Sequence, residues 1–429
     1  MDRFFAVCTA AVLLVWPATA TSFAVPGQSE GGFIEERLQR IDAVLEREIA
    51  EGRMPGAVAL IARHGDIVYH RSFGYADIES GKPMSNDGIF RIASMTKLLT
   101  SVGVMILYER GEFLLTDPVD KYLPEFANPQ IVTEVDEAGT ITATVAATQP
   151  IQIIHLLTHT SGIGYPWLPS AVSRRYAEVG IIDGPTSLPY TLKEQMQLLA
   201  EQPLLFEPGS QFAYGLNTDL LGYLIEVVSG QSLAEFIAAE ISGPLGMPDT
   251  HFYLPEDAAD RLVTIYAENA ENGLIAAREM ELPITLGSAD YPVEGARSHF
   301  SGGSGLSSTA SDYARFIQML LNDGELDGVR ILGRKSVELM RTPRVDLDFD
   351  GEPDFGLGLE VSHDIGKAGI LGSPGSLRWG GAFDTFFWID PAEDLVAVLM
   401  TQVAPLDAAS SINRQIEARF RVLVYQALE

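Results

Sequence analysis

Two pairs of short apolar segments, one pair near each end of the chain, constrain the fold more than any other feature. Residues 56–62 form an unbroken apolar run, and residues 67–69 resume it after a short turn. Near the C-terminus, residues 385–390 and 395–401 repeat this arrangement. Runs of this length that are bounded by turn residues are typical of buried strands. We therefore expect two hairpins from opposite ends of the chain in one sheet.

Helical periodicity occupies the sequence around these hairpins. Apolar residues recur every three or four positions within residues 33–50 and again within residues 94–108. The middle of the chain mixes helices with long loops, and residues 414–428 are expected to close the chain as a helix. The main helices of the middle part are expected at 152–159, 192–202 and 218–228. This order favours an α/β (α+β) fold in which helices flank an antiparallel sheet.

The chain is long enough for more than one domain, but the pattern favours one. It has 429 residues, of which 46% are apolar, and about 150 residues per domain would give two or three units. A sheet that needs both ends of the chain argues for a single domain over residues 33–429. We expect its α/β part in roughly 33–90 and 330–429, with a mostly helical part between them.

The first 20 residues have the pattern of a signal peptide. Arg3 precedes an apolar run over residues 4–16, and small residues follow at 18–20, where a signal peptidase cuts. Residues 21–32 are then a polar connector. The alternative is an uncleaved membrane anchor, although the run is short for a bilayer span. The pattern predicts a secreted or periplasmic protein with no stable membrane insertion after the leader is removed.

Composition excludes several chemistries. The only cysteine, Cys8, lies in the leader, so the mature chain would have no disulfide, thiolate nucleophile or cysteine-bound metal. The formal net charge of −29 repels nucleic acid and anionic lipid. We therefore expect no nucleic-acid partner and no cofactor, while the oligomeric state stays open.

Ser94 and Lys97 are the strongest candidates for a catalytic pair. Residues three apart share one face of a helix, so Lys97 is expected beside Ser94. A serine hydroxyl is a weak nucleophile until a base takes its proton, and a helix N-terminus favours the negative oxygen that forms on attack. The plain alternative is a helix-capping serine followed by a surface lysine, and only the surrounding sequence decides between the two.

Several motifs surround this pair in a fixed order. They are residues 91–97, 115–126, 155–162 and 300–312. Together they resemble the serine β-lactamase/DD-peptidase superfamily (class C β-lactamase-like) over roughly residues 34–425, and most closely its family VIII carboxylesterases. The resemblance implies the β-lactamase/transpeptidase-like fold, with a helical subdomain and the site between it and the sheet. It also implies that Ser94 is the nucleophile and Lys97 its partner base.

The superfamily's second element is a tyrosine in a Tyr-x-Asn motif, which acts as general base with the lysine. Tyr214 matches the tyrosine, but Leu216 stands at the asparagine position and Asn217 comes one residue late. The following Thr-Asp-x-Leu-Gly sequence is similar to family VIII carboxylesterases and related acyltransferases. The resemblance assigns Tyr214 to proton transfer.

The third element in β-lactamases is Lys-Thr-Gly on an edge strand, and Trp379-Gly380-Gly381 stands in its place. Two glycines let a substrate approach the strand backbone closely. By the resemblance, the backbone N–H groups of Ser94 and Ala382 form an oxyanion hole. Trp379 replaces the cation that would meet a β-lactam carboxylate with an apolar wall, although Arg378 beside it could still supply charge.

Two other motifs match the residue pattern of a catalytic motif but lack the context that the motif needs. Residues 27–31 spell Gly-x-Ser-x-Gly, but a nucleophile elbow needs a strand before it and a helix after it. His155 and His159 have the spacing of a zinc helix without the glutamate that follows the first histidine. We expect structural histidines and no metal site. The aromatic stretch 165–167 is a candidate lid over the pocket.

These assignments predict a secreted serine hydrolase that acts through an acyl-enzyme on a small-molecule ester or amide. The leading hypothesis is a carboxylesterase for short-chain or otherwise accessible esters. The absent Tyr-x-Asn and Lys-Thr-Gly motifs argue against the first alternative, a D-alanyl-D-alanine carboxypeptidase or β-lactamase. A second alternative is an inactive relative that binds peptidoglycan or a partner, and the retention of Ser94, Lys97 and Tyr214 argues against it. Whether water or another acceptor takes the acyl group stays open.

Overall fold

A computed structural model describes residues 28–29, 31–182, 184–269, 273–277, 289–347, 354–404 and 412–429. The expected signal peptide, with Cys8, lies outside the described residues, and so does most of the expected connector.

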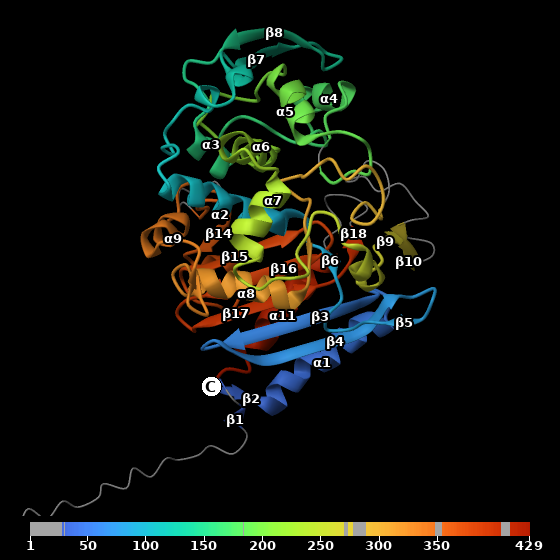
Figure 1. The fold of residues 1–429 in the computed structure, drawn as a ribbon. Coiled ribbons are helices and arrows are strands. Elements are labelled where there is room, and N and C mark those ends of the chain that lie inside the picture. Colours follow the sequence, from blue (N-terminus) through green and yellow to red (C-terminus); the bar gives the residue numbers. More distant parts are fainter. Residues whose placement is uncertain are drawn as a thin grey trace, which may run out of the picture.

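The centre of the protein is a seven-stranded antiparallel sheet to which both ends of the chain contribute (Figure 1). Its strand order is β14-β15-β16-β17-β3-β4-β5, and β17 pairs with β3 over six residue pairs. This pairing confirms one sheet built from two terminal hairpins. The strands are β3 (Gly56–Arg63), β4 (Asp66–Asp77), β5 (Lys82–Pro83), β14 (Glu360–Ser362), β15 (Ser376–Gly381), β16 (Thr385–Asp390) and β17 (Leu395–Met400).

The central strands are apolar throughout because helices cover both faces of the sheet. Successive side chains of a strand point to opposite faces. Accordingly, Val58 and Leu60 lie in one core cluster, while Ala59 and Ile61 lie in the other. The helices that cover the first face are α2 (Thr96–Glu109) and α8 (Ala310–Leu321), and those that cover the second are α1 (Glu35–Ala50) and α11 (Ile412–Tyr425) (Figure 1).

The region between the two halves contains the expected helices with shifted ends, together with strands (Figure 1). The helices are α3 (Ile153–Leu157), α4 (Ala171–Glu178), α5 (Leu192–Ala200), α6 (Asn217–Ser229) and α7 (Leu233–Ile237). Threonine and aliphatic residues alternate in a hairpin that the mostly helical expectation did not include. The hairpin is β7 (Gln130–Val135) with β8 (Ile141–Ala146), and a small sheet joins β9 (Tyr266–Asn269), β10 (Gly273–Ala276) and β18 (Val403–Ala404).

Short elements complete the fold. They are β1 (Gln28–Ser29), β2 (Phe33–Ile34), β6 (Phe90–Arg91), β11 (Ser307–Ser308), β12 (Glu325–Leu326), β13 (Val329–Arg330), α9 (Arg334–Met340) and α10 (Ile365–Ala368). Within the described ranges, no single helix is long and apolar enough to cross a bilayer; α6 and the helical segment 233–242 reach that length and composition only together, across an 82° bend.

The first and last long helices, α1 and α11, are tied together on the second face of the sheet. Ile34 N donates to Ala427 O (2.8 Å). Glu48 of α1 is buried and pairs with Arg53 and, across to α11, with Arg419. An ion pair between the first and last long helices therefore helps to close the domain.

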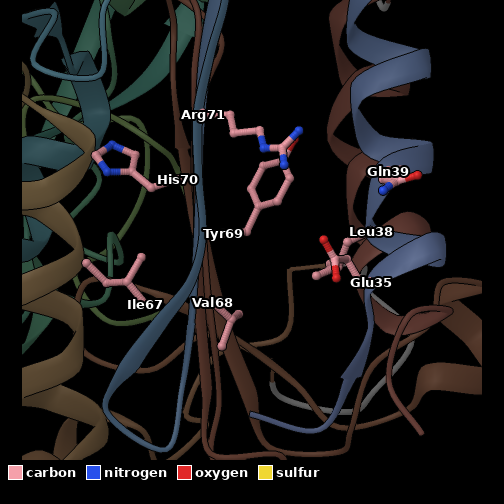
Figure 2. A pocket seen from close by; sticks show the side chains of 8 residues that line it. All are labelled: Glu35, Leu38, Gln39, Ile67, Val68, Tyr69, His70 and Arg71. Atoms are coloured by element: carbon pink, nitrogen blue, oxygen red, sulfur yellow. The ribbon is translucent and has the colours of Figure 1, made fainter. Parts of the chain in front are cut away.

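A surface cavity of about 310 Å³ lies on this second face, between α1 and β4 (Figure 2). Tyr69 and Arg71 point toward α1, whereas Ile67 and His70 point to the other side of the strand (Figure 2). The Tyr69 hydroxyl donates to Asp42 (2.6 Å), and Arg71 pairs with the same carboxylate. The Tyr69 and Arg71 side chains are thus already paired, and α2, which begins beside Ser94, lies on the opposite face of the sheet.

Asp312, in the first turn of α8, gives the protein a pH-dependent stability. Its buried carboxylate accepts hydrogen bonds from Asp249 N (2.8 Å) and Thr250 Oγ1 (3.0 Å). Burial raises the pKa of Asp312 to about 6. Between the ordinary pKa near 4 and this value, the folded state holds a proton that the unfolded state has lost. The contribution of this group to stability is therefore present below pH 4 and lost as pH rises through 6.

We expect Asp312→Asn, which cannot ionise, to gain stability relative to the wild type as pH rises. Thermal unfolding at pH 4 and pH 7 measures this: the melting temperature of the variant minus that of the wild type becomes more positive at pH 7. A difference that is the same at both pH values would contradict the burial effect.

Candidate active site

Ser94 lies in a 3₁₀ turn, Ala93–Met95, that leads directly into α2. The turn is held from the sheet side, where the Tyr313 hydroxyl of α8 donates to Met95 O (3.0 Å). Ala93 has a φ of 42°, in the left-handed region that residues other than glycine rarely adopt. The backbone therefore presents Ser94, half-buried, at the N-terminal end of α2, where the sequence predicted it.

Lys97 is buried, with 1% of its surface exposed. Its Nζ donates to Ser94 Oγ (3.1 Å) and to Gly303 O (2.7 Å), and it lies 4.7 Å from the centre of the Tyr214 ring. The alternative of a surface lysine is thereby excluded. An amine at this distance from a serine hydroxyl has the geometry that proton transfer needs.

Tyr214 stands beside Lys97 in a group of aromatic rings. Its hydroxyl accepts a hydrogen bond from Trp379 Nε1 (3.4 Å), and the two ring centres are 5.6 Å apart. The rings of His159 and Tyr165 pack on it at 4.8 and 5.4 Å. The structure thus brings Tyr214 and Trp379, which are far from Ser94 and Lys97 in the sequence, to the side of Lys97.

Asn217 has a different task from the asparagine of a Tyr-x-Asn motif. It is buried in the first turn of α6, and its Nδ2 contacts His159 Nδ1 (3.0 Å) and Ile163 O (3.2 Å). Ser161 Oγ donates to its Oδ1. Its amide therefore holds His159 and the loop after it.

The two histidines are structural, as expected from the sequence. His155 Nδ1 accepts from Gln152 N (3.2 Å) in the capping box of α3. Burial holds the pKa of His159 well below its usual range, so this ring is neutral. Ser29 of the literal Gly-x-Ser-x-Gly match lies in β1, which is followed by the strand β2 and not by a helix.

The end of β15 passes close to the segment before Ser94 because Gly381 has no side chain. A Cβ at this position would collide with Ile92 O and with Thr385 Oγ1. The next residue, Ala382, is exposed, and its N–H has no hydrogen-bond acceptor within the described part of the chain. The arrangement leaves an amide donor available at the strand end nearest the serine turn.

Arg378 is directed away from this group. Its Nε binds Glu360 Oε1 (2.5 Å), and its Nη1 lies 3.6 Å from Glu417 Oε1 of α11. Because adjacent side chains of a strand point to opposite faces, Trp379 and Arg378 cannot both face Ser94. The expectation that Arg378 could supply charge to a substrate is therefore wrong.

Sequence reasoning assigned no role to Gly303 or to Gln402. The 300–312 signature includes Gly303. However, Gly303 accepts the Lys97 hydrogen bond through its backbone carbonyl, and a backbone contact cannot be predicted from residue type. Gln402 side-chain atoms contact both Arg91 N (3.1 Å) and Arg91 O (3.0 Å), and so hold the strand that leads into the serine turn. A lone glutamine gave no signal of this contact.

We expect Trp379→Phe to lower kcat for an ester substrate about fivefold while leaving KM nearly unchanged. Phenylalanine keeps an aromatic wall but lacks the N–H that binds the Tyr214 hydroxyl, and one such hydrogen bond contributes about 1 kcal/mol. Steady-state kinetics of the two proteins measures the effect. A loss that appears entirely in KM would instead assign Trp379 to substrate binding alone.

The chain is similar to known proteins over most of its length. A family model described as Beta-lactamase matches residues 41–419. The chain is 34% identical to "Esterase EstB" of Burkholderia gladioli over 85% of this chain and 90% of that protein. It is 35% identical to "Protein Rv1367c" of Mycobacterium tuberculosis over 85% and 91%. Among solved structures, it is similar to "EstCE1, a hydrolase with promiscuous acyltransferase activity", with a TM-score of 0.77 and 30% identity over 91% of this chain and 99% of that one.

Proposed function

The chain belongs to the Beta-lactamase family and is a serine hydrolase; on this premise we propose that it is a secreted carboxylesterase for small, accessible esters. The observation that carries the proposal is the hydrogen bond from the buried Lys97 Nζ to Ser94 Oγ (3.1 Å), beside Tyr214. It combines a nucleophile and a base, and both are needed for an acyl-enzyme.

In the proposed reaction, Ser94 Oγ attacks the ester carbonyl while its proton passes to the Lys97–Tyr214 pair. The N–H groups of Ser94 and Ala382 donate to the oxyanion of the tetrahedral intermediate, and each such donor is worth roughly 3 kcal/mol in the transition state. The pair returns the proton to the departing alkoxide, which leaves as the alcohol. Water then attacks the acyl-enzyme with the same proton transfers in reverse order, and this releases the carboxylic acid and restores Ser94.

An ester is favoured over a β-lactam or a D-alanyl peptide by the wall of the site. Trp379 stands where a lactamase cation would meet a carboxylate, and Arg378 is paired with Glu360 on the other face of the strand. Tyr165 is buried beside Tyr214, and the half-exposed Trp167 stacks on it at 5.2 Å. Aromatic rings suit an uncharged ester better than a carboxylate. The esterase named among the relatives supports the same choice.

A panel of three substrates tests the reaction class. Wild type and Ser94→Ala would be offered p-nitrophenyl butyrate, a chromogenic cephalosporin and a D-Ala-D-Ala peptide. We expect ester turnover that is absent from the variant, and much lower efficiency with the other two. Far higher efficiency on the cephalosporin or the peptide would contradict the carboxylesterase proposal and indicate a β-lactamase or a D-alanyl-D-alanine carboxypeptidase. If no Ser94-dependent turnover of any of the three were found, an inactive binding protein would be favoured.

Secretion rests on the leader pattern in residues 1–20. Expression of the full chain in a bacterium, followed by terminal sequencing of the exported protein, tests it. We expect a mature N-terminus near residue 21. A full-length protein retained in the cytoplasmic fraction would contradict secretion, and one retained in the membrane fraction would favour the uncleaved anchor.

A further inference from the structure

We propose that Asp219 is a positioning residue of this site: it fixes Gly303, whose carbonyl holds Lys97 on Ser94. The inference rests on the proposed function, in which Lys97 helps to take the Ser94 proton. Asp219 lies 125 positions after Ser94 in the sequence, on α6, and so approaches the lysine from the helical region rather than from the sheet.

Asp219 is buried and bound to the segment that contains Gly303. It is 2% exposed, and its Oδ1 accepts from Ser301 Oγ (2.6 Å) and from Gly303 N (3.3 Å). The carbonyl of the same Gly303 accepts from Lys97 Nζ (2.7 Å). One residue thus connects the carboxylate on α6 to the amine on α2.

The fit between Asp219 and this segment is close. A Cβ on Gly303 would collide with Asp219 Oδ2, so only glycine allows the carboxylate to reach the backbone amide. Oδ2 itself is buried and has no hydrogen-bond partner among the described residues. Leaving a carboxylate oxygen in this state costs free energy. Packing of α6 against the loop would not by itself require a carboxylate at this position.

The segment is also held from the other side, and this makes the role of Asp219 separable from folding. Thr100 Oγ1 of α2 donates to Gly302 O (2.8 Å), and Leu306 N donates to Thr96 Oγ1 (3.1 Å). These contacts remain when Asp219 is removed. The segment then keeps its course but loses the hydrogen bond that fixes Gly303, so the Lys97 amine loses a fixed acceptor. Misplacing a catalytic group by about 1 Å can cost about 100-fold in rate.

The test compares Asp219→Ala with Asp219→Asn. Two rates are measured per folded molecule: labelling of Ser94 by a fluorophosphonate, and turnover of p-nitrophenyl butyrate. We expect Asp219→Ala to slow labelling and to lower kcat by about 100-fold, with KM within about threefold. Asparagine keeps an oxygen that accepts both hydrogen bonds, so Asp219→Asn is expected to recover most of both rates.

Glu48→Ala is the matched control, because Glu48 is also a buried, hydrogen-bonded carboxylate but lies on the other face of the sheet. We expect it to lower the melting temperature without changing either rate per folded molecule. An Asp219→Ala protein that labels at the wild-type rate would overturn the proposal and leave Asp219 a structural residue. Asp219→Asn as slow as Asp219→Ala would also overturn it, because the charge and not the positioning would then matter.

The labelling rate keeps this test apart from that of the proposed function. If wild type reacts with the fluorophosphonate but does not turn over the ester, the carboxylesterase proposal fails. The comparison of labelling rates still decides whether Asp219 positions Lys97.

Discussion

Lys97→Ala is expected to lower kcat for p-nitrophenyl butyrate by about 10⁴-fold, the upper end of what one general base contributes. The change removes the amine that lies 3.1 Å from Ser94 Oγ and leaves Gly303 O without its donor. Tyr214 remains, but its hydroxyl is bound to Trp379 Nε1. Because Lys97 is not part of the aromatic wall, KM is expected to change far less. Steady-state kinetics, with fluorophosphonate labelling of Ser94, measures both effects.

Two further lysine variants make the result specific. Lys97→Arg keeps the positive charge, but a guanidinium is not deprotonated in proteins, so it is expected to be nearly as inactive. Lys335→Ala removes an exposed lysine of α9 that pairs with Glu338, and it is expected to behave as wild type. If Lys97→Arg kept more than a tenth of the activity, Lys97 would act by its charge and not as a base.

Gly381→Ala is expected to lower kcat by about 10²- to 10³-fold, the loss that follows removal of one oxyanion donor. The added methyl group would collide with Ile92 O and Thr385 Oγ1, so the end of β15 must move away from the serine turn. The Ala382 N–H moves with it and no longer meets the oxyanion. Kinetics with the same ester measures the loss, and fluorophosphonate labelling is expected to slow in parallel.

Gly366→Ala is the matched control for this substitution. Gly366 lies in the short helix α10, and among the described residues a Cβ there would meet Asp364 Oδ1 alone, at 3.1 Å. We expect its kcat to equal that of the wild type. Equal activity of Gly381→Ala and Gly366→Ala, with both proteins folded, would remove Ala382 from the proposed oxyanion hole.

The parts of the fold that could be predicted from the sequence are those with a local signature. Strands β3, β16 and β17 appeared as apolar runs because helices bury both faces of the sheet where they lie. The three-residue spacing of Ser94 and Lys97 predicted that the two side chains lie side by side, and the hydrogen bond between them confirms it. The hairpin at residues 130–146 also has a local signature, the alternation of threonine with aliphatic residues, and the expectation of a mostly helical region there is wrong for this segment.

The contacts that complete the site are of another kind. Lys97 meets a backbone carbonyl 206 positions away, and long-range backbone contacts leave no residue-type signal. Asp219 was noticed only as part of a family motif, because its function depends on where the loop of Gly303 passes. Asn217 was compared with a catalytic asparagine, whereas the fold turns its amide to His159. The orientation of Arg378, in contrast, could have been predicted from the sequence, because neighbouring side chains of a strand point to opposite faces and Trp379 is the next residue.

The central claim, an acyl-enzyme on Ser94, is tested most directly by trapping it. The protein is mixed with excess p-nitrophenyl butyrate, quenched in acid within the first turnovers, and digested for mass spectrometry. We predict a peptide containing Ser94 that carries one butyryl group, together with a burst of p-nitrophenol equal to the enzyme concentration. The Ser94→Ala variant is predicted to show neither. A butyryl group on another residue, or ester turnover that persists in Ser94→Ala, would contradict the account.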